Sequence, residues 1–213
     1  PTLVTQGRYA HMQRKSALKA RHNTAMPYVT SEMAAIMEHV KAETGDEALA
    51  QGIHFSPTAL TLVRRVMMTG GQIIADTALA LSDIDKQNAR RLGVSTICYI
   101  DDPQVLALAE QRRTTRAEVA LDFALSQPGA KLIVVGSAPT ALDRLLRRHQ
   151  TEGLNDLVVL AAPTGFASVV QLKERIWESD LPAIVVRGKR GGTSAAVSIV
   201  NALMSEFIRQ LNL

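Results

Sequence analysis

The stretch VVRGKRGGTSAA, from Val185 to Ala196, contains the residues of this chain best suited to holding an anion. Three cationic side chains, Arg187, Lys189 and Arg190, precede a pair of adjacent glycines. Two hydroxyl residues then open a helix-forming stretch. This order predicts a strand turning into a helix N-terminus, where free backbone N–H groups and the helix dipole favour negative charge. The lysine precedes the glycine pair instead of following it, so a Walker-A phosphate loop is not indicated.

Other turns of the chain carry polar residues that could take part in chemistry. Asp76 ends an apolar run and could be a general acid or base, although capping of the following turn is the favoured interpretation. Ser137, in GSAPTAL, could cap a helix or donate to a ligand. Arg116 falls in a first helical turn, where a cation opposes the dipole, so it either reaches an anion or is solvated. For Lys173, in the middle of a helix, a surface position is favoured.

Alternating strand-like and helix-like segments supply the frame for these turns. The segments run from a helix near residue 57 to a last helix from about Thr193 to Leu211. The predicted strands are short, β-branched and apolar throughout, as expected for strands covered on both faces; they lie in GQIIADT, STICYI, AKLIVVGS, DLVVLAAP and PAIVVRG. We therefore expect a Rossmann-like α/β fold, with a parallel five-stranded sheet and helices on both faces. Ligands of such sheets bind beyond the carboxyl ends of the strands, where the turns above would lie.

Three further expectations concern boundaries. No linker interrupts the array, so residues 1–213 are expected to form one domain, with residues 1–30 as a polar, basic N-terminal arm. Ser31 is expected to cap a helix over residues 31–41. Ser56 is expected to cap the next one, with Pro57 at its first position.

Composition excludes several classes of protein. The 213 residues are 46% hydrophobic and 21% charged, with no apolar run long enough to span a bilayer, so no membrane partner is expected. The single cysteine, Cys98, rules out an internal disulfide and favours a cytoplasmic location. A net charge of +4 favours acidic partners, but the basic residues are scattered and no nucleic-acid motif occurs, so a nucleotide or nucleic-acid module is the weakest alternative.

Over about residues 10 to 205, the chain resembles the precorrin-8X methylmutase (precorrin isomerase) family of cobalamin biosynthesis. The resemblance is carried, in this order, by the stretches KSALKAR, TGDEALAQGIHFSPTAL, ADTALALSDIDK, TTRAEVAL, VVGSAPTALDRLL, PTGFASVVQLKE and VVRGKRGGTSAAVSIVNALM.

The resemblance implies a homodimeric α/β protein that binds a corrin precursor bearing many carboxylates. The family moves a methyl group from C11 to C12 of precorrin-8X, or of cobalt-precorrin-8, producing hydrogenobyrinate or its cobalt-containing counterpart. The resemblance implies that this step needs no metal and no cofactor. The residues that it implies for substrate binding are Ser16, Thr77, Arg116, Ser137, Thr140, Lys173, Lys189, Arg190, Gly191, Gly192 and Thr193.

One departure from the family pattern concerns the histidine thought to act as the acid that helps the methyl shift. In the corresponding stretch, HVKAETGD, the position of that histidine is Ala42. The nearest histidine is His39, one helical turn earlier, and it is the candidate substitute acid. Two alternatives follow: an isomerase, weakened or with a relocated acid, and a relative that binds a corrinoid or related tetrapyrrole without isomerising it.

Overall fold

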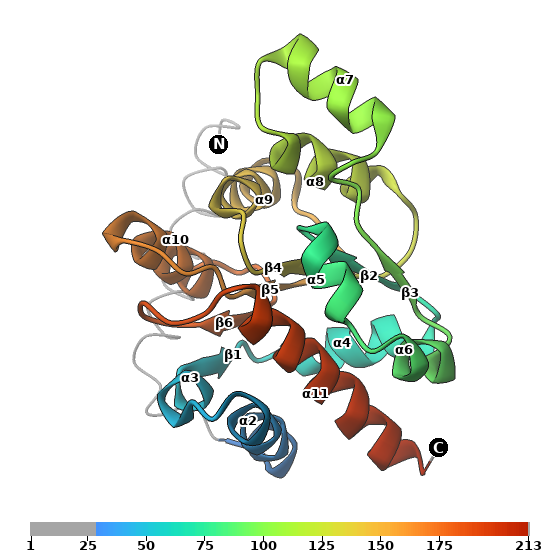
Figure 1. Ribbon diagram of the computed structural model, residues 1–213, viewed down its shortest axis with the longest axis vertical. Helices are drawn as coiled ribbons and strands as arrows, with labels where there is room; N and C mark the ends of the chain where they lie inside the picture. The colour runs from blue at the N-terminus through green and yellow to red at the C-terminus, as the bar shows by residue number, and fades with distance from the viewer. Residues whose placement is uncertain (1–28, 213) are drawn as a thin grey trace, which may run out of the picture.

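The computed structural model describes residues 29–212 and builds them around one six-stranded sheet in the order β1-β6-β5-β4-β2-β3 (Figure 1). The strands are β1 (Ile53–Phe55), β2 (Gln72–Ala75), β3 (Ser95–Ile97), β4 (Lys131–Val135), β5 (Leu157–Ala161) and β6 (Ala183–Val186). The five strands from β2 to β6 run parallel, which confirms the predicted parallel sheet and all five of its segments.

The sixth strand corrects the predicted strand number. β1 pairs antiparallel with β6 at one edge of the sheet, with Ile53 opposite Val186 and Phe55 opposite Ile184. Ser56 continues this contact, because its N–H donates to the carbonyl of Ala183 and its hydroxyl accepts from the Ala183 N–H. Ser56 is therefore not the helix cap that the sequence suggested. A three-residue strand with a histidine at its centre has no periodicity by which it could have been predicted.

Helices cover both faces of the sheet, as Figure 1 shows. One face packs against α2 (Ser31–Thr44), α4 (Ala59–Met68), α5 (Ala78–Asp83), α6 (Lys86–Leu92) and α11 (Thr193–Leu211), with the short α3 (Glu47–Gln51) beside β1. The other face packs against α8 (Arg116–Ser126), α9 (Pro139–Glu152) and α10 (Ala167–Glu178), and α7 (Pro103–Arg112) packs on α8.

Alternation along the buried strands produces these two layers. In β4, Leu132 and Val134 belong to the core under α11, whereas Ile133 and Val135 belong to the core under α8 and α9. Successive strand side chains point to opposite faces, so a continuous apolar run serves both cores at once. The last helix, α11, is mostly buried from Ala195 to Ile208, and it spans the residues predicted for it.

Capping residues fix where several helices begin. Thr30, not Ser31, caps α2 by accepting from the Met33 N–H. Thr115 caps α8 and forms a reciprocal capping box with Glu118, so Arg116 lies in the first helical turn, as predicted. Caps of this kind satisfy backbone donors that the helix itself leaves unpaired.

Two further statements apply to the described part of the chain. None of its helices has both the length and the apolar character needed to cross a membrane. Ser16 and nearly all of the expected arm, residues 1–30, lie outside the described residues.

Candidate functional site

The turns that follow β4, β5 and β6 meet at one edge of the sheet. The Gly192 N–H donates to the carbonyl of Ala162, after β5, with 2.6 Å between the atoms. A Cβ on Gly136, after β4, would lie 2.9 Å from the Cα of Thr193. Such close approach of three backbone segments is possible because small residues occupy the contact points. The carboxyl ends of the strands therefore form one continuous surface, as expected for the ligand edge of a parallel sheet.

Asp76, after β2, holds the turn after β4 in place. Its Oδ2 accepts from the backbone N–H groups of Gly136, Ser137 and Ala138, at 3.1, 2.7 and 2.8 Å. Capping of a turn was the favoured interpretation of Asp76, but the turn it caps belongs to another strand, about sixty residues away. The N–H groups ahead of α9 are thus already satisfied by protein and are not available to an anionic ligand.

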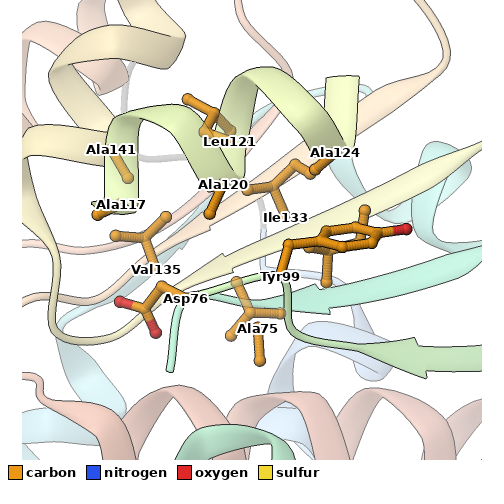
Figure 2. A pocket seen from close by; sticks show the side chains of 12 residues that line it. Ala75, Asp76, Tyr99, Ala117, Ala120, Leu121, Ala124, Ile133, Val135 and Ala141 are labelled. Atoms are coloured by element: carbon orange, nitrogen blue, oxygen red, sulfur yellow. The ribbon is translucent and has the colours of Figure 1, made fainter. Parts of the chain in front are cut away.

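The second oxygen of Asp76 has no hydrogen-bond partner among the described residues. Its Oδ1 is buried without a hydrogen bond and borders an apolar cavity of about 20 Å³. Figure 2 shows Asp76 and Tyr99 with the small side chains Ala117 and Ala120 of α8 around this space, which has room for about one water molecule. Burial raises the pKa of Asp76 above its usual value, and the three N–H bonds offset this only in part.

Of the other predicted side chains near this turn, Thr77 and Thr140 have protein partners. Thr77 caps α5 by accepting from the Ala80 N–H at 3.1 Å. Thr140 lies exposed on the first turn of α9, with its hydroxyl 3.2 Å from that of Thr115 at the start of α8. The side chain of Ser137 is exposed and does not cap α9. Thr140 and the start of α8 are therefore brought together.

Arg116 follows Thr115 and is more than half exposed. Its guanidinium lies 3.3 Å from the carboxylate of Asp101, which is also exposed. An exposed ion pair of this kind contributes little to stability. The arginine can therefore exchange Asp101 for another anion at low cost, which fits the anion-reaching interpretation.

The glycine loop, which we define as Gly188 to Gly192, joins β6 to α11. Its backbone uses conformations that favour glycine: φ is +138° at Gly191 and +106° at Gly192. A Cβ on Gly191 would lie 2.1 Å from the Ala162 carbonyl oxygen, so no other residue fits there. The N–H groups of Thr193 to Ala195, which begin α11, have no acceptor among the described residues.

Of the three cations counted in the sequence, two form ion pairs and one has no partner among the described residues. Arg187 forms a bidentate pair with Glu174 and lies over the ring of Trp177. Arg190 pairs with Asp46, with 2.7 Å between Nη1 and Oδ2. Lys189 is exposed, and its ammonium contacts no acceptor within residues 29–212.

Lys173 corrects the surface position favoured for it. Its side chain, on α10, is 0% exposed and is among the largest fully buried side chains of the described chain. Its Nζ donates to the carbonyl oxygen of Arg190 at 2.9 Å. Burial lowers the pKa of its ammonium to about 8, with Glu174 opposing the shift.

His39 and Ala42 both lie on the exposed side of α2. The His39 Nε2 is 3.8 Å from Glu43 Oε2, and the imidazole is about two-fifths exposed. Glu43 in turn accepts from the buried hydroxyl of Ser198, in the second turn of α11, at 2.6 Å. The end of α2 is thus fixed beside the start of α11, so Ala42 lies near the end of α11 that follows the glycine loop.

The remaining described histidines lie elsewhere. His54, on β1, packs edge-on against Trp177, and burial lowers its pKa. His149 lies 3.0 Å from Asp180 on the α9 side of the sheet. No group of three or more histidine, cysteine or acidic residues within residues 29–212 is arranged to hold a metal ion.

Two sets of contacts in the candidate site were not predicted from the sequence. The Arg190–Asp46 pair and the Asp76 contacts join residues 144 and about sixty positions apart. The only sequence signal for the first is that GDEAL and GKRGG both belong to the stretches carrying the family resemblance.

Comparisons with known proteins match this arrangement. The precorrin-8X methylmutase family model matches residues 11–206. The cobalt-precorrin-8 methylmutase of Salmonella typhimurium is 36% identical over 171 residues, which is 80% of each chain. That of Methanothermobacter thermautotrophicus is 33% identical over 172 residues, covering 80% of this chain and 79% of that protein.

Known structures agree with the sequence comparisons. A solved structure described as a precorrin-8X methylmutase related protein superposes with a TM-score of 0.75 at 27% identity, covering 88% of this chain and 98% of the other. The family match extends over most of the chain and includes every turn of the ligand edge. This chain belongs to the precorrin-8X methylmutase family.

Proposed function

We propose that this chain binds precorrin-8X, or cobalt-precorrin-8, at the carboxyl edge of its sheet and isomerises it by moving a methyl group from C11 to C12. The shift takes place within one molecule, so no second substrate is consumed. The observation that carries the proposal is the start of α11, where the N–H groups of Thr193 to Ala195 and the nearby ammonium of Lys189 have no partner within residues 29–212. Several ligand carboxylates would find charge-assisted partners there.

Two further groups extend this surface. Arg116 and Thr140 lie at the adjoining ends of α8 and α9, and neither is tied into a buried network. Cationic and hydroxyl groups at two places along the edge suit a broad ligand with carboxylates at its periphery better than a single phosphate.

The acid is assigned to His39. An imidazole titrates near neutrality and can therefore donate a proton at the operating pH, whereas Ala42 offers none. His39 lies one helical turn from Ala42 on the exposed side of α2, with its Nε2 3.8 Å from Oε2 of Glu43. General acid catalysis is worth roughly 10²–10⁴-fold in rate.

The second candidate function is binding without isomerisation, and Ala42 is the specific observation that favours it. Both candidates predict that the protein binds hydrogenobyrinate, the family's product. An absorption titration measures that binding, and absence of a spectral change at high protein concentration would contradict both.

Histidine variants separate the candidates. Incubation with precorrin-8X should convert it, with an orange-to-pink spectral change, and His39→Ala should slow conversion by roughly 10²-fold or more. His149→Ala is the matched control, because His149 pairs with Asp180 on the α9 side of the sheet. If the native chain binds without converting while Ala42→His converts, the binding-only candidate holds and the pocket is intact.

We also propose that the chain acts as a single domain, as a cytoplasmic homodimer, and without metal, nucleotide or nucleic acid. The family resemblance and the single cysteine support this proposal. Light scattering coupled to size exclusion should give twice the 23.1 kDa chain mass.

A further inference from the structure

Lys173 is a charged side chain in a place where apolar packing would suffice. It is fully buried on α10 between Leu172 and Ile176, both of which belong to the core beneath that helix. Burying an ammonium is costly, and within residues 29–212 its Nζ donates a single hydrogen bond, to the Arg190 carbonyl oxygen. A methionine of similar length would fill the same space without that cost. The amine therefore has a purpose other than packing.

The carbonyl that Lys173 binds belongs to the centre of the glycine loop. On one side of that carbonyl, the Arg190 guanidinium is fixed to Asp46. On the other side, the Gly192 N–H is fixed to Ala162. Neither contact fixes the Arg190–Gly191 peptide itself, and Lys173 restrains it by donating to its carbonyl oxygen.

Rotation of that peptide would reverse what the loop offers a ligand. The Arg190–Gly191 peptide is trans, so its carbonyl and its N–H point in opposite directions. Since the carbonyl points toward the buried Lys173, the Gly191 N–H points away from it, and no described residue accepts from this N–H. In the reversed orientation, a carbonyl oxygen would face an anion and repel it.

We propose that Lys173 is a positioning residue that fixes the Arg190–Gly191 peptide so that the Gly191 N–H is presented to a carboxylate of the ligand. This inference rests on the proposed function and replaces the direct substrate contact that the family resemblance implied for Lys173. The ligand's carboxylate would then lie between the Gly191 N–H, the Lys189 ammonium and the first turn of α11.

The test uses the full chain with Lys173→Met, which keeps length and apolar bulk but removes the donor. Lys131→Met is the matched control, because Lys131 is also buried and donates to a glycine carbonyl, that of Gly129, at the opposite end of the sheet. Both variants lose a buried lysine, so a general effect of that loss appears in both.

The first measurement needs no ligand. In the ¹⁵N- and ¹³C-labelled protein, Lys173→Met should shift or split the Gly191 amide and Arg190 carbonyl resonances, whereas Lys131→Met should leave them in place. Unchanged resonances in Lys173→Met would overturn the inference, because the peptide would then be held without the amine.

The second measurement adds hydrogenobyrinate. In the native chain the Gly191 amide proton should move downfield on binding, and Lys173→Met should weaken binding by about ten- to a hundredfold, the usual worth of a hydrogen bond to a charged group. An amide proton that does not move, or equal weakening in Lys131→Met, would overturn the inference. If the native chain does not bind at all, the proposed function fails, while the ligand-free resonances still decide whether Lys173 orients the peptide.

Discussion

The carboxylate of Asp76, at the end of β2, lies 2.7 Å from the backbone nitrogen of Ser137, in the turn after β4. The side chain that follows β2 thereby fixes the turn after the neighbouring strand, β4. The same oxygen also accepts hydrogen bonds from the N–H groups of Gly136 and Ala138. The first consequence is for stability, because three backbone donors depend on a single acceptor atom.

Asp76→Ala should lower the free energy of unfolding by about 3 kcal/mol or more, because it leaves three donors unpaired in a partly buried turn. Asp101→Ala is the control and should cost no more than about 0.5 kcal/mol, because its partner Arg116 is an exposed arginine. Urea denaturation measures both values. Equal losses in the two variants would mean that the Asp76 contacts do not hold the turn.

Lys173 makes stability depend on pH in the alkaline range. Its pKa is lowered to about 8 in the folded chain and is close to 10.4 in the unfolded one, so between these values only the unfolded chain keeps the proton. Stability rises with pH wherever the unfolded chain binds more protons. Between pH 7 and pH 10, Lys173 should therefore add roughly 2–3 kcal/mol to the free energy of unfolding.

Lys173→Met has no such group, so it should be more stable than the native chain at pH 7, and its advantage should shrink as the pH approaches 10. Urea denaturation of both proteins at each pH measures the difference between their free energies of unfolding. The contributions of other groups that titrate at alkaline pH are the same in both proteins and cancel in this difference. A difference that stays constant with pH would show that Lys173 keeps its ordinary pKa in the folded chain.

Gly191 should tolerate no side chain. Gly191→Ala places a Cβ 2.1 Å from the Ala162 carbonyl oxygen, at a φ of +138°, so the loop must move; we expect a loss of at least about 3 kcal/mol together with loss of hydrogenobyrinate binding. Gly153→Ala is the matched control: its φ of +66° is also unfavourable, but nothing lies within 4 Å, and about 1 kcal/mol is expected. Thermal unfolding measures both losses of stability. Similar losses in Gly191→Ala and Gly153→Ala would show that the close contact with Ala162 does not cause the effect.

Lys189 should affect binding without affecting stability. Lys189→Ala removes an exposed, unpaired ammonium, so the free energy of unfolding should change by less than about 0.5 kcal/mol, while affinity for hydrogenobyrinate falls about tenfold in low salt and less in high salt. Arg65→Ala makes the same change in net charge at the opposite end of the sheet, beside Asp156, and should leave the affinity unchanged. Equal losses of affinity in Lys189→Ala and Arg65→Ala would show that net charge alone, and not the position of Lys189, determines the affinity.

The parallel sheet could be predicted because its five strands are continuous apolar runs, each recognisable without knowledge of its neighbours. The three residues of β1 could not, because their pairing depends on Val186 and Ala183, about 130 positions away. Local features of the site, such as the loop and the start of α11, were likewise predictable. The ion-pair partners of its arginines could not be predicted. Glu174 and Asp46 come close to Arg187 and Arg190 only in the folded chain.

Lys173 illustrates the same limit most clearly. Its surroundings in the sequence, QLKERIWES, mix polar and apolar residues so evenly that a surface position was the favoured interpretation. Its burial follows from the glycine loop, whose Arg190 carbonyl meets the amine from the end of a different strand.

We expect this chain to isomerise its ligand although Ala42 stands where the family resemblance implies a histidine. Conversion of precorrin-8X by excess protein in a single turnover, followed by the orange-to-pink change in visible absorption, tests it most directly. We expect complete conversion by the native chain, slowed roughly a hundredfold or more in His39→Ala. Precorrin-8X that remains bound and unchanged for hours on the native chain would contradict the claim.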